Sequence, residues 1–234
     1  MKTTPPSARP RPVAKSPTAR KIFLVDDHPV IREGIAMLID QEPDFVVCGE
    51  ADNAPLAVEM IPKAAPDLAI IDITLKTTNG IELLKDLKTL LPNLPVLVMS
   101  MHDENLYAER ALRAGARGYV MKQEPTDVIL AAIRRVLAGE LHLSNGVKEK
   151  MLNRLALGRK DTVTFSMDTL SDREMEVFQL IGNGFGTRQI AERLNLSVKT
   201  IDSYREHLKT KLQLASGADL VHHAIQWMKS EHVI

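Results

Sequence analysis

The sequence predicts two folded parts: a doubly wound α/β domain with a five-stranded parallel sheet, followed by an all-α domain of four helices. Two observations predict the first part. Short, uninterrupted apolar runs recur within residues 21–140, and stretches with helical periodicity separate them. One observation predicts the second part, because residues 170–229 carry helical periodicity without a strand-like run. A chain of 234 residues is long enough for two domains.

Each expected strand is a short apolar run without alternation, which is typical of strands buried on both faces. These runs are residues 22–25, 45–48, 68–71, 96–99 and 119–121. Between them, apolar residues recur at helical spacing, as in 30–39 and 83–90. Pro62, Pro92 and Gly115 mark expected helix ends. Strands that alternate with helices in this way form a parallel sheet covered by helices on both faces.

Composition excludes several classes of protein. Hydrophobic residues make up 44% of the chain, and no apolar run approaches the ~18 residues of a membrane span, so we expect a cytoplasmic protein. Cys48 is the single cysteine, which excludes an internal disulfide and a cysteine-based zinc site. Residues 21–147 carry 12 basic and 19 acidic residues, whereas 148–234 carry 13 basic and 11 acidic. This asymmetry indicates two parts with different partners.

Two segments are expected to lie outside the folded parts. Residues 1–20 are expected to form a disordered basic tail, because they contain five prolines and no acidic residue. The same prolines argue against the amphipathic helix of a transit peptide. Residues 141–168, which include Ser144-Asn145-Gly146 and a Thr- and Asp-containing stretch, are expected to link a domain at 21–140 to one at 169–234.

Polar side chains follow the expected strands at their carboxyl ends, where sheets of this kind bind ligands. Asp26 and Asp27 follow the first strand and Asp72 the third, while Ser100 ends the fourth and Lys122 the fifth. Alone, each is more often a cap or turn residue. Three carboxylates at one edge repel one another unless a hard cation such as Mg²⁺ lies among them. An ammonium and a hydroxyl nearby suit a phosphoryl group beside the metal.

These residues, together with Asn79-Gly80, Tyr119 and Pro125, carry a family resemblance. Residues 21–138 resemble the receiver domain of two-component response regulators. The resemblance implies that Asp72 accepts a phosphoryl group from a sensor histidine kinase, in a transfer that the domain's own residues catalyse to and from this side chain. By this implication the protein is not an enzyme with an external substrate.

The resemblance also assigns the surrounding residues. The implied Mg²⁺ ligands are Asp26, Asp27, Asp72 and the backbone carbonyl of Thr74. Lys122 is implied to pair with the phosphate and Ser100 to reorient toward it, while Tyr119 follows Ser100 inward. The sequence departs from the family at Lys76, where proline is most common, which adds a charge near the phosphate.

The second expected part contains a helix-turn-helix. Ser171 lies three residues before Glu174, which predicts a capping box for a helix that stops at Gly182. Thr187 is expected to cap a short helix. Ser197 is expected to cap a longer one at 198–213, and a last helix is expected at about 217–229.

Three runs in this part, Leu170–Val177, Gln189–Leu194 and Ser197–Asp202, resemble the C-terminal DNA-binding domain of LuxR-type regulators. The two resemblances together identify a NarL/FixJ-type response regulator. They imply double-stranded DNA as a partner, a homodimer when phosphorylated, and helix 198–213 in the major groove. Base-edge contacts are expected from Lys199, Asp202, Ser203 and Glu206, which share one helical face. Phosphate contacts are expected from Thr200, Tyr204, Arg205, Lys209 and Lys211.

The acids on this helix are unusual for a surface that binds a polyanion. Asp202 and Glu206 either read a base or form ion pairs with Arg205 or Lys209. Two other functions stay open at this point. One is a phosphorylation-independent DNA-binding regulator whose acidic cluster is structural or binds Mg²⁺ only. The other is a Mg²⁺-dependent phosphatase or phosphotransferase, although Thr74 stands where such enzymes carry a second acid.

Overall fold

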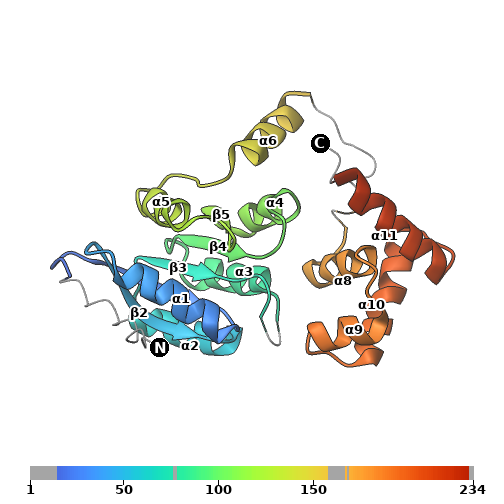
Figure 1. Ribbon diagram of the computed structural model, residues 1–234, viewed down its shortest axis with the longest axis horizontal. Helices are drawn as coiled ribbons and strands as arrows, with labels where there is room; N and C mark the ends of the chain where they lie inside the picture. The colour runs from blue at the N-terminus through green and yellow to red at the C-terminus, as the bar shows by residue number, and fades with distance from the viewer. Residues whose placement is uncertain (1–14, 76–77, 158–166, 168, 232–234) are drawn as a thin grey trace, which may run out of the picture.

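The computed structural model describes residues 15–75, 78–157, 167 and 169–231, which form a sheet-containing domain and a helical domain (Figure 1). All five strands are parallel, in the order β2-β1-β3-β4-β5. The strands are Arg20–Val25 (β1), Phe45–Ala51 (β2), Leu68–Ile71 (β3), Val96–Ser100 (β4) and Gly118–Met121 (β5). The predicted fold class is confirmed for both parts of the chain.

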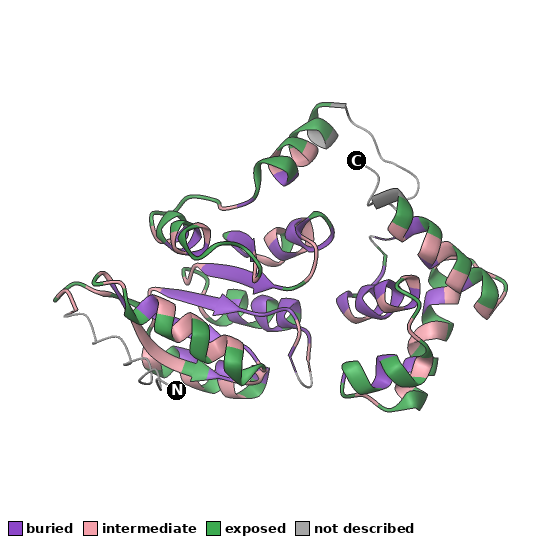
Figure 2. Cartoon of the chain, in the orientation of Figure 1, coloured by how far each residue is buried: buried purple, intermediate pink, exposed green. Residues whose placement is uncertain are grey.

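Helices cover both faces of the sheet, so the strands are buried (Figure 2). They are Pro29–Asp40 (α1), Ala54–Ala64 (α2), Gly80–Leu90 (α3), Glu104–Ala114 (α4) and Thr126–Leu137 (α5). Because side chains alternate along a strand, Ile22 and Leu24 of β1 pack with α1 and α5, whereas Phe23 and Val25 pack with α2, α3 and α4. The carboxyl ends of β1, β3, β4 and β5 are thereby held at one edge.

Local sequence accounts for most helix ends. Gly115 takes a left-handed conformation, with φ of 112°, at the end of α4, as predicted. Pro62, by contrast, lies inside α2 and not at its end. It is in the last turn, where a missing N–H removes a single helical hydrogen bond, and the helix stops at Ala65, whose φ is 45°.

The helical domain contains Asp172–Gly182 (α8), Thr187–Arg193 (α9), Val198–Lys211 (α10) and Gly217–Glu231 (α11). Its core includes Phe178 and Trp227, whose ring centroids are 5.6 Å apart. The capping box of α8 is confirmed, and Ser197 caps α10 by accepting a hydrogen bond from the Thr200 N–H. The expected cap of α9 is wrong by one residue: Gly186 precedes the helix, and its N–H donates to Gln189 Oε1 at 2.9 Å.

The segments expected to lie outside the domains contain more structure than predicted. Helix α6 (Asn145–Leu157) lies within the expected linker, and residues 158–166 and 168 lie outside the described residues, as do residues 1–14 of the tail. The disorder expected through residue 20 is wrong for residues 15–20. Lys15 Nζ donates to the Asp40 carbonyl at 2.8 Å, the Ser16 N–H donates to the Pro43 carbonyl, and β1 begins at Arg20. Within the described ranges, no helix combines the length and apolarity needed to cross a membrane.

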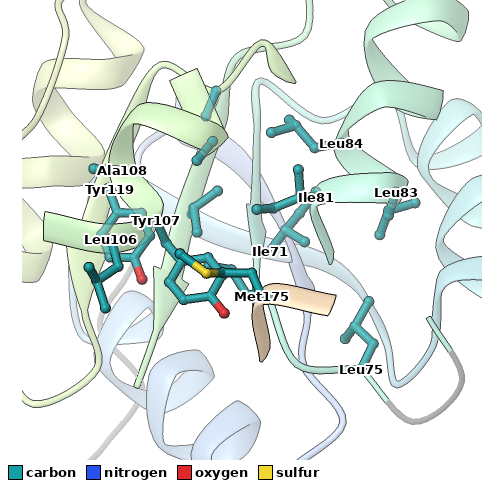
Figure 3. Close-up of a cluster of buried hydrophobic side chains, with 14 of the residues drawn as sticks. Ile71, Leu75, Ile81, Leu83, Leu84, Leu106, Tyr107, Ala108, Tyr119 and Met175 are labelled. Carbon is teal, nitrogen blue, oxygen red and sulfur yellow. The ribbon is translucent and has the colours of Figure 1, made fainter. Parts of the chain in front are cut away.

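Helix α8 packs between the two domains, and all but a few of its residues are buried. Its inner side packs in the helical domain, while Met175 lies in a cluster with Ile81 and Tyr107 of the sheet domain (Figure 3). Polar contacts surround this cluster. Arg110 and Lys85 each lie 3.2 Å from a carboxylate oxygen of Asp172.

A third polar contact extends this interface. The Tyr107 hydroxyl donates a hydrogen bond of 3.0 Å to Gln179 Oε1. Asp172, Glu176 and Gln179 are spaced at helical intervals of four and three residues, which places them on one side of α8. This side faces the sheet domain, and the opposite side, which carries Phe178 and Ile181, faces the helical core.

Replacement of Gly80 by alanine is expected to destabilise the sheet domain strongly. An added Cβ would lie 1.9 Å from the Asp72 carbonyl oxygen, so the backbone next to Asp72 would have to move, at a cost of at least about 3 kcal/mol. Urea unfolding followed by circular dichroism measures the loss. Gly34→Ala on α1 is the matched control, because nothing lies within 4 Å of its added Cβ and the helix gains about 1 kcal/mol. Equal stability of the two variants would contradict the close approach.

Candidate functional site

Three charged side chains meet at the carboxyl edge of the sheet. Lys122, after β5, places Nζ 2.6 Å from Asp26 Oδ2 and 2.8 Å from Asp72 Oδ2. The Lys122 side chain is 3% exposed and that of Asp72 also 3%, so these contacts are almost shielded from water. In such surroundings each unpaired charge would be costly. The structure therefore brings together the residues that the sequence placed at the ends of β1, β3 and β5.

The same edge offers a compact set of metal ligands. Asp26, Asp27, His28 and Asp72 can each supply one atom, and these atoms lie within 4.8 Å of one another. Asp72 Oδ1 is buried and has no hydrogen-bond partner among the described residues, so it has an acceptor oxygen to spare. Three carboxylates and one lysine leave a net charge that a divalent cation would balance. The donor set fits Mg²⁺, which prefers oxygen ligands.

His28 was not among the residues that the sequence predicted for this site. Its Nδ1 lies 2.7 Å from Asp27 Oδ1 and 3.4 Å from Asp26 Oδ1. The sequence signal was present, because His28 directly follows the acidic pair and precedes the first helix. An imidazole next to two carboxylates orients them without entering the buried core, since its side chain is 56% exposed.

Burial raises the pKa of the Asp72 carboxyl group, and the neighbouring Lys122 ammonium opposes this by lowering it. The Asp26 carboxylate adds to the upward shift. A carboxyl group must be ionised to act as a nucleophile. Lys122 therefore has two effects here: it favours the charged form of the buried acid, and it holds a positive charge where an attacking carboxylate needs one.

The loop after β3 is fixed on both sides of its two undescribed residues. Thr74 and Asn79 pair as an isolated antiparallel bridge, and the Gly80 N–H donates to the Ile73 carbonyl at 2.6 Å. The Asn79 side chain caps α3 by accepting from the Ile81 N–H at 2.9 Å. These contacts explain the Asn79-Gly80 pair in the sequence. They fix the backbone at Thr74, which follows Asp72 by two residues. The Thr74 carbonyl is an expected Mg²⁺ ligand.

The two expected switch residues lie beside this loop. Ser100 is fully buried at the end of β4, and its hydroxyl accepts from the His102 N–H at 3.3 Å. Tyr119 is also buried, and its hydroxyl donates to the His102 carbonyl at 2.8 Å. Burial raises the pKa of the Tyr119 phenol. The ring lies inside, where it packs in the cluster that includes Met175, and its expected movement with Ser100 stays a prediction.

A second polar cluster lies beside the first and was not predicted. His102 Nε2 is 2.9 Å from the Thr74 hydroxyl and 3.9 Å from Glu176 Oε1. Burial lowers the pKa of His102 to about 4, with help from the positive charges of Lys122 and Arg173, so the ring is neutral at pH 7. Glu176 and Arg173 come from α8. The helical domain thus reaches the loop that carries Asp72.

The expected DNA-reading face lies on α10. Lys199, Asp202, Ser203 and Glu206 are all exposed, while Ile201 and Leu208 of the same helix are buried in the domain core. Glu206 Oε2 lies 2.8 Å from Lys209 Nζ, so one of the two acids pairs with a base on its own helix. Of the expected phosphate contacts, Tyr204 and Arg205 are half-buried.

Two residues expected to contact DNA phosphates have other partners here. Lys211 Nζ lies 2.6 Å from Glu174 Oε2 and 3.2 Å from the Thr169 carbonyl. Its ammonium therefore joins the end of α10 to the capping box of α8. The Thr200 hydroxyl lies 2.7 Å from the Ser197 hydroxyl and so belongs to the cap of α10. The sequence prediction treated both as free groups, because their partners are distant along the chain or in the cap.

Comparison with known proteins agrees with this arrangement. Residues 22–134 match the family model of the response regulator receiver domain, and residues 168–224 match the model of the luxR family of bacterial regulatory proteins. Over 201 residues the chain is 37% identical to a Pseudomonas aeruginosa protein assigned to the transcriptional regulators, covering 86% of this chain and 95% of that protein.

Further similarity comes from a named regulator and a solved structure. The oxygen regulatory protein NreC of Staphylococcus epidermidis is 31% identical over 211 residues, covering 88% of this chain and 97% of its own length. RcsB of Salmonella enterica serovar Typhimurium, solved bound to a promoter with the phosphomimetic BeF3⁻, is 27% identical with a TM-score of 0.54, covering 87% of this chain and 96% of that one. The chain therefore belongs to the LuxR-family (NarL/FixJ-type) two-component response regulators, which control transcription in response to phosphorylation.

Proposed function

We propose that Asp72 is the phosphoacceptor and that its phosphorylation by a sensor histidine kinase controls dimerisation and DNA binding through α10. The observation that carries the proposal is the placement of Lys122 Nζ between Asp26 and Asp72, both within 2.8 Å. Asp72 has the Lys122 ammonium at Oδ2, while its Oδ1 has no hydrogen-bond partner among the described residues. Such a group suits nucleophilic attack on phosphorus.

The reaction forms one bond and breaks another. A carboxylate oxygen of Asp72 attacks the phosphorus of a phosphohistidine, the P–N bond breaks, and the histidine of the kinase leaves with the bonding electrons. Asp26, Asp27, Asp72 and the Thr74 carbonyl would hold Mg²⁺, which neutralises the phosphoryl oxygens when bound. Lys122 follows the developing charge, because its ammonium moves from a carboxylate oxygen of Asp72 to an oxygen of the new acyl phosphate.

Ser100 and Tyr119 transmit the change in this proposal. Ser100 lies at the end of β4, where its hydroxyl can turn from the His102 N–H toward a phosphoryl oxygen. The His102 backbone also accepts the hydrogen bond of Tyr119, so a shift of Ser100 reaches Tyr119 through this one residue. Both side chains are buried, and a small displacement there must repack their neighbours.

The output of the protein is DNA binding in the cytoplasm. The exposed face of α10 supplies Lys199, Asp202 and Ser203 to base edges, and paired half-sites follow from a two-fold symmetric dimer. RcsB, the relative solved on a promoter, supports this use of the domain. A small-molecule phosphatase is disfavoured, because Thr74 has no acidic group to protonate a leaving group, and its hydroxyl is engaged with His102.

Incubation with acetyl phosphate and Mg²⁺ is expected to add one phosphoryl group to the wild-type chain and none to Asp72→Asn, because the amide is not a nucleophile. Intact-mass spectrometry measures the addition, and EDTA should abolish it. Asp86→Asn on the exposed side of α3 is the matched control and should behave as wild type. Equal labelling of Asp72→Asn and wild type would assign the phosphoryl group to another residue.

Asp202→Ala is expected to relax the choice of base at one position by about 1–3 kcal/mol, since an exposed carboxylate that accepts from cytosine is lost. Selection from a random DNA pool, followed by competition titrations, measures this. Lys211→Ala is the control: it should lower thermal stability, because buried Glu174 loses its partner, and leave base preference unchanged. A changed preference in the control, with none in Asp202→Ala, would show that the reading face is assigned wrongly.

A further inference from the structure

Arg32, in the first turn of α1, lies next to the acidic pair that follows β1. Its NH1 donates a hydrogen bond of 2.6 Å to the backbone carbonyl of Asp26, and its Nε donates one of 2.9 Å to Glu50 Oε2. The Arg32 side chain is only 18% exposed. Arg32 also lines the same small cavity as Asp26 and Asp72. A half-buried cation thus stands beside a site that attracts cations, although the phosphoryl transfer proposed above does not use it.

The hydrogen bond from Arg32 restrains the backbone of both carboxylates. The carbonyl that accepts it belongs to the peptide group between Asp26 and Asp27, and because this group is planar, fixing its carbonyl limits the backbone on either side. Two further bonds hold the same turn. The Asp26 N–H donates to the Ala51 carbonyl at 3.1 Å, and Asp26 Oδ1 accepts from the His28 N–H at 2.9 Å. The turn that presents the acidic pair is therefore held from α1 and from β2.

Glu50 fixes the guanidinium and balances its charge. It lies near the end of β2, where it is level with Leu24 of β1. An unbalanced cation at this place would repel a divalent ion at the neighbouring carboxylates. A planar guanidinium can donate to two acceptors at once, whereas a lysine ammonium is a point charge on a flexible stem. The pair of Arg32 and Glu50 can thus hold the turn without a net positive charge.

We propose that Arg32, held by Glu50, is a positioning residue for Mg²⁺, which sets the affinity of the site by fixing the turn between β1 and α1. The inference rests on the proposed function, in which Asp26, Asp27 and Asp72 hold the ion. Groups that orient metal ligands typically account for about 10- to 100-fold in metal affinity. Position and charge predict opposite signs here, because removal of a cation by itself would favour the binding of another cation.

The test is calorimetric titration of the full-length chain with MgCl₂. We expect Arg32→Ala to bind Mg²⁺ about 10-fold more weakly than wild type. Arg32→Lys keeps the charge but cannot serve both acceptors, so we expect it to bind more weakly than wild type as well. Arg134→Ala is the matched control: this arginine also pairs with two acids, Glu42 and Asp44, but before the start of β2, and its loss should change the affinity by less than about 2-fold.

A second readout separates positioning from a role in the reaction itself. The rate of labelling by acetyl phosphate is measured as the Mg²⁺ concentration is raised. In Arg32→Ala, the Mg²⁺ concentration that gives half the maximal rate should rise by the same factor as the dissociation constant. The rate at saturating Mg²⁺ should stay within about 2-fold of wild type, because Arg32 contacts a backbone carbonyl and not the reacting groups. A residue that only stabilised the fold would change neither quantity.

The outcomes distinguish this inference from the function on which it rests. Tighter or unchanged Mg²⁺ binding by Arg32→Ala would overturn the inference and leave Asp72 as the phosphoacceptor, and so would binding by Arg32→Lys equal to that of wild type. Circular dichroism shows whether each variant is folded, and Arg32→Lys decides the question if Arg32→Ala unfolds. Failure of wild type to bind Mg²⁺ would overturn both the inference and the metal site of the proposed function.

Discussion

The structure depends on the buried contact of Lys122 with Asp26 and Asp72. Charges this deep inside a protein are tolerated only in pairs, and three strands must end at the same edge to make the pairs. The parallel sheet meets this requirement, since all its carboxyl ends lie on one side. Among the residues that the structure describes, none donates a hydrogen bond to the second carboxylate oxygen of Asp72. A site built in this way is poised to accept a cation and a phosphoryl group, because either one completes it.

The second constraint is that α8, a helix of the DNA-binding domain, packs against both domains. A helix with one domain on each side is buried almost all round, and its polar residues then need partners from both. Glu174 finds its partner, Lys211, within the DNA-binding domain, whereas Asp172 finds Lys85 and Arg110 in the receiver domain. The interface combines such pairs with an apolar cluster around Met175. Interfaces between domains that contain many polar contacts separate more readily than wholly apolar ones.

Much of this could be predicted from the sequence, for identifiable physical reasons. Buried parallel strands are uninterrupted apolar runs, and catalytic residues of such sheets follow them directly, so Asp72, Ser100 and Lys122 could be placed at one edge. Caps such as Ser171 and Ser197 depend on neighbours within three residues, and both were predicted correctly.

The features that could not be predicted depend on partners far along the chain. No sequence neighbour of Lys211 indicates that its ammonium pairs with Glu174. A single glutamate on a helix, such as Glu176, is normally interpreted as a charge exposed to water. Lys15 was assigned to the tail, since its contact with the Asp40 carbonyl appears only once the first strand and first helix have packed. Composition describes a segment and not its surroundings, so it did not predict that residues 15–20 have a defined structure.

In the function proposed above, phosphorylation of Asp72 controls the pairing of two DNA-binding domains and does not uncover the reading helix, because the reading face of α10 is already exposed. The most direct measurement compares affinities for one half-site and for paired half-sites, before and after phosphorylation. We expect affinity for a single half-site to change by less than about 2-fold, and affinity for the pair to rise by about 10-fold or more, which is the gain expected when two linked modules bind together. An equal rise on a single half-site would contradict it, since that result requires the receiver domain to cover the reading face.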